Sequence, residues 1–562
     1  MSALANLILW LGNILSTLIA IMLVTGGGFL HFGHLKVEVS SPEAWMIGLV
    51  ALGLIWTRAL GQPIGRFGWA GSVWSWVERR LLAGASTAVP ARILLGAVFA
   101  VLCIAHIFRH LALHNHGCDV SMVHQPLFYP WGNPPLHADF SRVGTALSEH
   151  LLYTFFLIAP VTSLCKSDFL IYVIQALLIG VALAALVLRG PLKKTPQALL
   201  FGAFLVLSYK ALRASVVWDF REDAIAFASF IGMMLALASR RFVLYFVFVM
   251  LAILTKENIF AITLIFCVPV LFSREFPLAK KERKAVVAAT AAISLIYGVL
   301  AFKVLIPSYT HNDQGHALFS RYGAYGHTVS EIAINILITP RIWFELASQV
   351  FNRSGILYLL FLLLPIAPFL RSREALVWMV PALAGILMNV AHPYFTQRMM
   401  IFHYELIIFP FLFFVALAGI RDAVQTRRIS KVLWALVFGL CVFGRPPGFE
   451  LQDHFPSLRE WQSSRALAAL QYGETVAVDE RLSAQVNHLP HLHIFTPPLR
   501  PLQPGPELET WMKTALRDQP RYVIIDQDLP AEIELRNWLL SARAEVVWGE
   551  LGKSRALVLR QP

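Results

Sequence analysis

The chain has 562 residues, of which 57% are apolar and only 14% charged, and its mean hydropathy is +0.62. Soluble domains average about 45–50% apolar and about 25% charged residues, so this composition excludes an ordinary soluble enzyme and a disordered protein. The formal net charge is +13, but no basic stretch is interleaved with aromatic residues, so nucleic acid is not an expected partner.

Apolar runs predict a polytopic, all-α membrane bundle. A helix rises about 1.5 Å per residue, so crossing about 30 Å of hydrocarbon takes about 20 residues. Thirteen runs are interpreted as transmembrane helices, and they lie near 5–30, 43–57, 92–108, 169–188, 196–210, 224–239, 242–255, 259–273, 285–306, 355–370, 374–391, 406–420 and 432–444. A further run at 149–164 is interpreted as a helix along the outer interface, because counting it as a span would reverse the side of most later basic clusters.

The distribution of Lys and Arg predicts the orientation of the bundle. Basic residues concentrate in the loops that face the cytoplasm when the N-terminus is cytoplasmic. We therefore expect a multi-pass protein of the bacterial inner membrane whose C-terminal segment is extracytoplasmic. Most of the positive charge is then an orientation signal and does not indicate a partner.

Composition divides the chain into three predicted parts. Residues 1–91 are expected to form an N-terminal two-helix membrane extension and a cytoplasmic loop, 92–444 a transmembrane core with a large first outer loop at 109–168, and 445–562 a small extracytoplasmic α/β domain. The last part is richer in Pro, Gly and charge. Its β-like runs at 475–479, 522–526, 546–548 and 556–559 alternate with helical stretches at 457–472, 507–517 and 530–541.

The long outer loop contains the first candidate catalytic residues. Asp119, Glu149 and His150 lie in it, together with Gln125. A lone Asp in a loop is most often only solvated. Carboxylates that lie with histidines beside a membrane cavity are better candidates for general base catalysis or phosphate handling.

Histidines and cysteines give no firm metal signal. His106, His110 and His114 recur every four residues and share one helix face. No acidic residue stands at ligand-type spacing to them, so interfacial packing is favoured over a metal site, and a divalent metal is left open. The five cysteines are scattered without a CxxC pair, which excludes a disulfide framework and a zinc site.

Two turns between short spans carry charges that are drawn below the membrane surface. The run of 14 residues before Lys256 reaches only about 21 Å as a helix, which is less than the hydrocarbon thickness. Glu257 in the same turn, and Asp219 and Asp223 between two other short spans, are placed in the same way. Ionisable residues at this depth usually face a cavity or each other. Contact with a ligand and a structural ion pair, Lys256 with Asp219 or Glu222, therefore both remain open.

Two further outer loops carry arginine beside tyrosine. One contains Arg321 and Tyr322, and the other contains Arg398 and Tyr404. Arginine suits bidentate contact with phosphate oxygens, so phosphate binding is one interpretation. The alternative is an aromatic belt at the interface with a snorkelling arginine.

Taken together, these residues resemble the GT-C superfamily of integral-membrane glycosyltransferases. They are most similar to the domain family of predicted membrane proteins numbered two thousand and seventy-nine, which is related to that superfamily, over roughly residues 95–420. The family's first loop has Asp, five residues and Gln, and its later turns read Gly-Asp-His-Phe, Asp-Phe-His-Pro-Glu, Lys-Glu-Asp and Tyr-Gly. The similar residues here are Asp119 and Gln125, then Glu149-His150, Asp219-Phe220 with Asp223, Lys256-Glu257, and Arg321-Tyr322-Gly323.

The resemblance implies transfer of a sugar from a polyprenyl-phosphate donor to a cell-envelope acceptor on the outer face of the inner membrane. Asp119 would be the general base, with Glu149 and His150 beside it as catalytic residues. Lys256, Arg321 and Arg398 would meet the phosphate charge. The implied partners are the lipid-linked sugar and membrane lipid.

Two other functions compete with this interpretation. A lipid or solute transporter or flippase would also bury charges, but it would place them near the middle of the membrane and is expected to contain inverted repeats. A non-catalytic scaffold would use the C-terminal domain to bind an envelope partner. The polar residues here cluster at the outer ends of the runs, which favours transfer.

Overall fold

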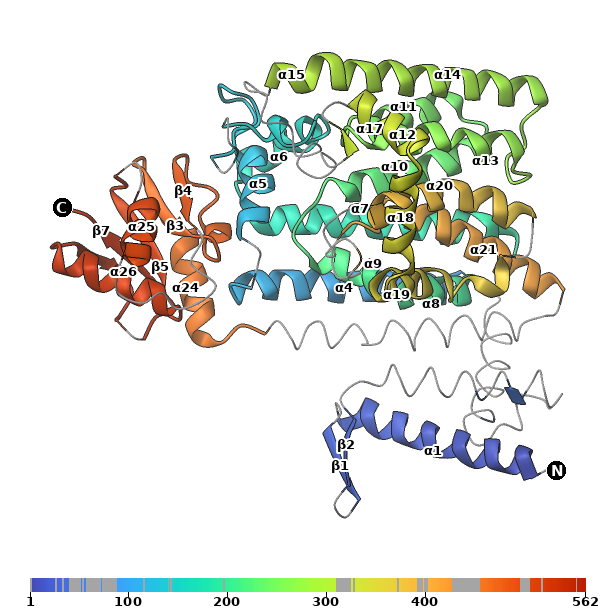
Figure 1. Cartoon of the computed structure of the whole chain (residues 1–562), viewed down its shortest axis with the longest axis horizontal. Coiled ribbons are helices and arrows are strands. Elements are labelled where there is room, and N and C mark those ends of the chain that lie inside the picture. Colours follow the sequence, from blue (N-terminus) through green and yellow to red (C-terminus); the bar gives the residue numbers. More distant parts are fainter. Residues whose placement is uncertain are drawn as a thin grey trace.

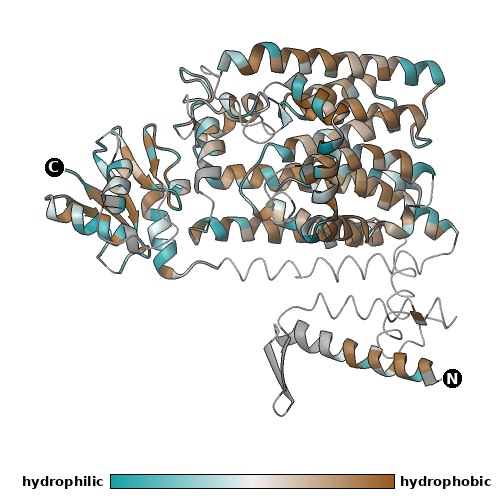
Figure 2. Cartoon of the chain, in the orientation of Figure 1, coloured by the Kyte–Doolittle hydropathy of each residue, from teal (hydrophilic) through white to brown (hydrophobic). Residues whose placement is uncertain are grey.

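Helices make up most of the described chain, and a small sheet lies at one end of the helical bundle (Figure 1). Apolar residues run along the bundle helices, and polar residues are frequent in the sheet domain and at helix ends (Figure 2). The computed structural model describes residues 3–25, 28–32, 35–39, 52, 55–56, 72, 88–114, 117–139, 141, 144–195, 198–309, 325–326, 329–370, 373–391, 398, 403–426, 455–495, 506–516, 519–551 and 553–562.

Four helices in the described part are long and apolar enough to cross a membrane. They are α4 (Val89–Leu111), α7 (Asp168–Arg189), α14 (Lys280–Leu300) with its continuation through η6 (Ala301–Leu305) and α15 (Ile306–Tyr309), and α20 (Arg373–Ala391). Two bent pairs raise the number to six if each pair is one span. A multi-pass, mainly helical membrane protein is thus confirmed, whereas the count of thirteen is not. Almost all of 43–57 and all of 432–444 lie outside the described residues.

The first bent pair is α8 (Leu199–Ser208) with α9 (Lys210–Val217), which meet at 68°. A break in a buried helix leaves carbonyl groups without their helical donors, and burying them unpaired is costly. Here the guanidinium of Arg213 donates from Nη1 to the carbonyl oxygens of Leu207 at 2.8 Å and Ser208 at 2.9 Å. The segment between the expected spans 196–210 and 224–239 thus begins with the mostly buried helix α9.

The second bent pair is α18 (Pro340–Phe351) with α19 (Arg353–Leu363), which meet at 67° at Asn352. Asn352 accepts a hydrogen bond from the amide of Gly355 at 2.8 Å and so caps the N-terminus of α19. α17 (Val329–Ile338) precedes this pair. Helices α17 and α18 therefore lie in the segment between the expected spans 285–306 and 355–370, which we expected to be an outer loop.

Several apolar helices are too short to cross a bilayer alone. They are α6 (Phe155–Cys165), α10 (Asp223–Ala238), α11 (Phe242–Ile253), α12 (Ile259–Ile265) and α13 (Cys267–Phe272). The 12 residues of α11 span about 18 Å, which confirms that this run is short. The 11 residues of α6 likewise span about 16 Å, so the run at 149–164 does not contain a helix of transmembrane length.

At the N-terminus, α1 (Ala3–Thr25) is followed by a β-hairpin that we did not expect. Strands β1 (Gly28–Phe32) and β2 (Leu35–Val39) pair antiparallel. The expected span 5–30 therefore ends at Thr25. The three glycines at 26–28 give the physical reason, because glycine is unfavourable inside a helix.

The C-terminal sheet has the strand order β4-β3-β5-β7-β6. Its strands are β3 (Val476–Asp479), β4 (Leu492–Phe495), β5 (Tyr522–Asp526), β6 (Glu545–Trp548) and β7 (Ala556–Arg560), and its helices are α24 (Leu458–Ala468), α25 (Pro506–Ala515) and α26 (Pro530–Ser541). β3 pairs parallel with β4 and β5, whereas β7 runs antiparallel to β5 and β6. The four predicted strands and three predicted helices are confirmed. β4 (Leu492–Phe495) was not predicted.

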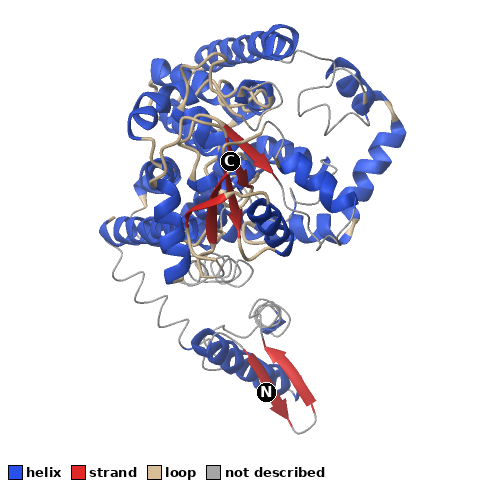
Figure 3. Ribbon diagram, turned by 90° about the vertical axis from the view of Figure 1, so that its left-hand side faces the viewer, coloured by secondary structure: helices blue, strands red, loops and turns tan. Residues whose placement is uncertain are grey.

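Side-chain alternation in the sheet builds a core on each face. Val476, Val478 and Ile524 belong to one apolar cluster, and Val523 and Ile525 belong to another. The first cluster also contains Leu113, which follows α4, so this face packs toward the bundle. Seen from the sheet's end of the molecule, the strands lie in front of the helices (Figure 3).

Three carboxyl groups are buried together where β3 and β5 end. Asp479 ends β3, Asp526 ends β5, and Glu532 in the first turn of α26 accepts a hydrogen bond from the amide of Asp526. Arg555 lies 3.3 Å from Asp526 (Nε to Oδ2). Burial raises the pKa of Asp479 to about 6, and burial with the charge of Asp479 raises the pKa of Glu532 well above its usual range.

Glu532→Gln is expected to stabilise the C-terminal domain at alkaline pH. Because folding raises both pKa values, the stability these acids contribute is fully present below about pH 4 and is lost as the pH rises through about 6 and beyond. The side-chain amide of the glutamine can donate a hydrogen bond to Asp479 at any pH, and its carbonyl oxygen can still accept from the backbone amide of Asp526. We expect the free energy of unfolding to rise by about 1–3 kcal/mol. Hydrogen exchange of the β3 and β5 amides, compared with wild type at the same pH, measures this. The variant should be better protected at pH 8 than wild type, and weaker protection there would contradict the prediction.

Candidate functional site

A cluster of charged side chains lies where α10 begins and α11 ends. Lys256 Nζ lies 2.5 Å from Glu222 Oε1 and 3.9 Å from Asp223 Oδ2, and all three side chains are buried. Of the two pairs that the sequence left open, Lys256 therefore forms an ion pair with Glu222. The structural interpretation of Lys256 is confirmed to that extent, and a ligand-binding role remains a prediction.

The chain direction of two packed helices brings these charges together. Glu222 is the N-cap of α10 and Asp223 its first residue, whereas Lys256 follows the C-terminal end of α11. Because α10 and α11 are consecutive and pack side by side, the start of one meets the end of the other (Figure 1). Carboxylates are favoured at a helix N-terminus and cations near a C-terminus, so both helices stabilise their own member of the cluster.

The turn before α21 (Phe409–Gln425) adds a histidine and a third buried acid. His403 Nε2 lies 3.3 Å from Asp223 Oδ2. Glu405 is only 1% exposed, and neither of its carboxyl oxygens has a hydrogen-bond partner among the described residues. Burial, with the charge of Asp223, raises the pKa of Glu405 to about 8, so this carboxyl group holds its proton at neutral pH. A buried acid with such a pKa is suited to exchanging a proton with a substrate.

The sequence did not identify Glu222, His403 and Glu405 as site residues. His403 and Glu405 adjoin an apolar run, as Lys256 does. That position was the available signal, because charges next to a short run are drawn into the membrane.

A second contact joins the segment 109–168 to the turn that contains Lys256 and Glu257. His150 Nδ1 lies 2.8 Å from Glu257 Oε1, and the amide of Leu151 donates to the other oxygen of Glu257 at 3.1 Å. Glu149, next to His150, is half-buried. The structure therefore brings predicted residues of two distant segments into one place.

Asp219 lies beside the end of α4. Its Oδ1 lies 3.6 Å from Arg109 Nη1. Arg109 also donates to the carbonyl oxygens of Val217 and His114, and its guanidinium lies 4.3 Å from the ring centroid of Trp218. This network fixes the chain between α9 and α10, so the described contacts of Asp219 are structural.

Gln125 lies where the bundle meets the C-terminal domain. It belongs to α5 (Gly117–Phe128), and its Nε2 donates to Asp139 Oδ2 at 2.6 Å. The same oxygen of Asp139 accepts from the backbone amide of Leu492 in β4 at 2.8 Å. The described contacts of Gln125 therefore link α5 to the C-terminal sheet.

Arg398 and Tyr404 both precede α21 in the chain. Arg398 is buried and donates from Nη1 to the carbonyl oxygen of Val390 at 3.0 Å. The ring of Tyr404 lies 4.3 Å from that of His403, and its carbonyl oxygen accepts from Asn389 at 3.4 Å. Tyr404 thus flanks the histidine that pairs with Asp223.

The structure does not describe the side chains of three predicted site residues. Arg321 and Tyr322 lie outside the described residues, and only the backbone of Asp119 is described, within α5. α5 packs against α6 and against η3 (Ala146–Ser148), the turn just before Glu149 and His150. The helix that carries Asp119 therefore adjoins the segment that reaches Glu257.

The histidines at the end of α4 are used in packing. His106 stacks on Tyr172 with ring centroids 3.8 Å apart, and His110 Nδ1 lies 2.9 Å from the hydroxyl of Tyr172. Across the part of the chain that the structure describes, no group of three or more His, Cys, Asp or Glu side chains is arranged to hold a metal ion.

Comparison with known proteins gives one family match. Residues 131–550 match DUF2079, a family described as predicted membrane protein. A search of curated proteins finds no match. Among solved structures, ArnT from Cupriavidus metallidurans is similar in its form bound to undecaprenyl phosphate, with 13% identity, a TM-score of 0.44, and coverage of 83% of this chain and 97% of that one. Its apo form scores 0.42 at 14% identity and the same coverage.

The oligosaccharyltransferase of Archaeoglobus fulgidus, tethered to an acceptor peptide, is also similar. It has 13% identity and a TM-score of 0.34, over 77% of this chain and 69% of that one. At these scores the solved structures do not by themselves assign a function to this chain.

Proposed function

This chain belongs to the DUF2079 family of predicted membrane proteins, and from that membership and the charged cluster we propose that it is a membrane glycosyltransferase. The proposed donor is a sugar linked to a polyprenyl phosphate, and the proposed acceptor belongs to the cell envelope on the outer face of the inner membrane. The observation that carries the proposal is the buried cluster of Lys256, Glu222, Asp223, His403 and Glu405 at one end of the helices.

The proposed reaction forms one bond and breaks one bond at the anomeric carbon of the sugar. An acceptor hydroxyl attacks that carbon and loses its proton to a base, while the bond to the phosphate oxygen breaks and the polyprenyl phosphate leaves with the electron pair. Asp119 is proposed as the base. Lys256 and Arg398 are proposed to stabilise the phosphate charge in a site with little water.

The depth of the cluster suits a lipid-linked donor. α11 is too short to carry Lys256 out to bulk water, so the cation lies near the level of lipid headgroups. A phosphate attached to a prenyl chain is found at the same level. Charges at the helix ends, rather than at mid-span, favour transfer over transport.

Glu405 and His150 have supporting roles in this proposal. Glu405 holds a proton at neutral pH, because burial raises its pKa to about 8, and can donate a hydrogen bond to a phosphate or sugar oxygen. His150 is oriented by Glu257, which places a second titratable group beside the segment that carries Asp119. Arg321 and Tyr322 remain predicted phosphate contacts.

The proposal is tested with purified full-length protein in liposomes and polyprenyl-phosphate sugars that are radiolabelled on the sugar. An envelope fraction that lacks the protein supplies the acceptor. Transfer of the label to this fraction, with release of polyprenyl phosphate, is expected. Movement of intact labelled lipid across the bilayer without cleavage would instead identify a transporter. No cleavage and no binding of any lipid-linked sugar would contradict both functions and favour the scaffold.

A further inference from the structure

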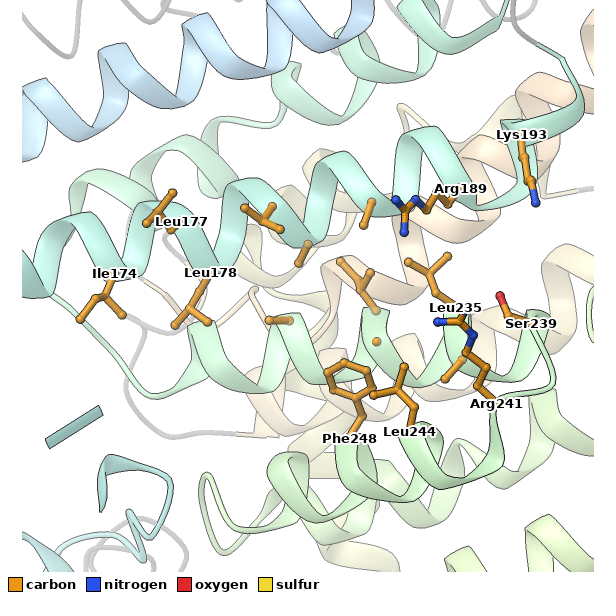
Figure 4. A pocket seen from close by; sticks show the side chains of 17 residues that line it. Ile174, Leu177, Leu178, Arg189, Lys193, Leu235, Ser239, Arg241, Leu244 and Phe248 are labelled. Atoms are coloured by element: carbon orange, nitrogen blue, oxygen red, sulfur yellow. The ribbon is translucent and has the colours of Figure 1, made fainter. Parts of the chain in front are cut away.

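A second site lies on the helical bundle, in a groove between α7, α10 and α11 (Figure 4). Its volume is about 780 Å³, and most of its lining is aliphatic or aromatic, as at Leu178, Leu244 and Phe248. Gly232 supplies part of the α10 side, and a Cβ there would lie 2.6 Å from the ring of Phe248. The close approach of that ring to α10 therefore depends on glycine, and the groove has the form of a slot for an apolar chain.

Cationic side chains gather at one end of this groove. Arg189 is the last residue of α7, Lys193 lies in η4 (Pro191–Lys194), and Arg241 is the N-cap of α11. All three line the groove together with Ser239. Figure 4 shows the nitrogen atoms of Arg189, Lys193 and Arg241 at one end, with Ile174 and Leu178 at the other.

These three cations are not neutralised by the described part of the protein. Within it, none of the three forms an ion pair, and all three are exposed. Neighbouring cations behave differently, since Arg240 forms an ion pair with Glu282 and Arg421 lies 2.7 Å from Glu275. The positive charge at the groove's end is therefore available to an external anion.

The cationic end lies at the opposite ends of α10 and α11 from the candidate active site. α7 has 22 residues from Asp168 to Arg189, which corresponds to about 33 Å and is enough to cross the hydrocarbon core of about 30 Å. α10 begins at Asp223 in the charged cluster and ends beside Ser239 in the groove. The two sites therefore lie at opposite ends of the same helices.

We propose that this groove binds one anionic phospholipid of the leaflet opposite the candidate active site. The phosphate lies between Arg189, Lys193 and Arg241, and an acyl chain follows the apolar slot toward Leu178. Basic pockets between transmembrane helices recognise anionic headgroups in this way. The occupant is a lipid rather than free phosphate. Most of the lining is apolar, and only an acyl chain can cover this apolar surface. This site does not depend on the proposed glycosyl transfer.

The test uses the full-length protein in detergent and native mass spectrometry with dioleoyl-phosphatidylglycerol. We expect one lipid to bind with high affinity and the neutral dioleoyl-phosphatidylcholine to bind at least about tenfold more weakly. The triple variant Arg189→Gln, Lys193→Gln, Arg241→Gln should lose about tenfold or more in phosphatidylglycerol affinity, because each basic residue near the headgroups contributes to its attraction. If the triple variant does not fold, Arg241→Gln alone should show a smaller loss in the same direction.

Two controls separate the groove from charge alone. Arg240→Gln, which removes a neighbouring but ion-paired cation, should leave the phosphatidylglycerol affinity unchanged. Ala185→Trp, which narrows the slot and keeps the cations, should weaken lipid binding at unchanged melting temperature. Equal affinity for the two lipids, an unaffected triple variant, or displacement of the lipid by millimolar inorganic phosphate would each overturn the proposal.

Discussion

Replacing Lys256 with methionine is expected to abolish sugar transfer and to destabilise the fold. The variant leaves Glu222 and Asp223 buried without the cation that lies 2.5 Å and 3.9 Å away. Breaking a buried ion pair by removing one partner costs about 3–5 kcal/mol. If Lys256 also stabilises the leaving phosphate, transfer should fall by at least about 100-fold. The melting temperature in detergent and the transfer rate with saturating donor measure the two effects.

A double variant separates the structural effect from the catalytic one. Lys256→Met with Glu222→Gln removes both charges, so most of the lost stability should return. Transfer should stay lost in this double variant, because no cation replaces Lys256. Lys256→Arg keeps the charge and should retain both stability and part of the activity. Activity that returns with stability in the double variant would show that Lys256 is only a structural partner of Glu222.

Asp119→Asn is expected to preserve expression and melting temperature while lowering transfer by about 10²–10⁴-fold, the usual contribution of a positioned general base. Asparagine has nearly the same size and remains polar, so α5 should fold normally. It cannot take up the acceptor proton. The rate is measured with the same labelled donor, and donor binding is measured separately with a non-transferable polyprenyl phosphate.

The matched control for Asp119 is another carboxylate neutralised away from the cluster. Glu345 on α18 is exposed and lies 2.9 Å from Arg341 one helical turn away. Glu345→Gln should transfer sugar at the wild-type rate, because exposed pairs of this kind contribute little to stability. If Asp119→Asn retained full transfer with intact donor binding, Asp119 would not be the base.

Local patterns were sufficient for the general architecture. Long apolar runs identified α4, α7 and α20, and alternation with turn residues located β3, β5, β6 and β7. These features depend on side chains within a few residues of each other, where hydrophobic periodicity acts directly. The same reasoning missed β4 and the helices α17 and α18, because short or amphipathic stretches between strong signals resemble loops.

The sequence also predicted that α11 is short, and from this it predicted a buried charge at Lys256. Which partner Lys256 has was not visible, since Asp219 and Glu222 lie only three residues apart. In the structure Asp219 faces Arg109 and Glu222 faces Lys256. Side chains this close in sequence can point to different neighbours, so the outcome depends on how α4 and α11 pack around the start of α10.

The sequence by itself determined that this is a multi-pass helical membrane protein with a C-terminal sheet, and that charges lie at the ends of short helices, because length and hydropathy set these properties locally. Only the tertiary structure decided that Glu405 joins the charged cluster, that Gln125 contacts the sheet domain, and that Arg189 and Arg241 share one groove. These residues are separated by tens to hundreds of positions. Their meeting depends on helix packing and chain direction, which no local pattern specifies.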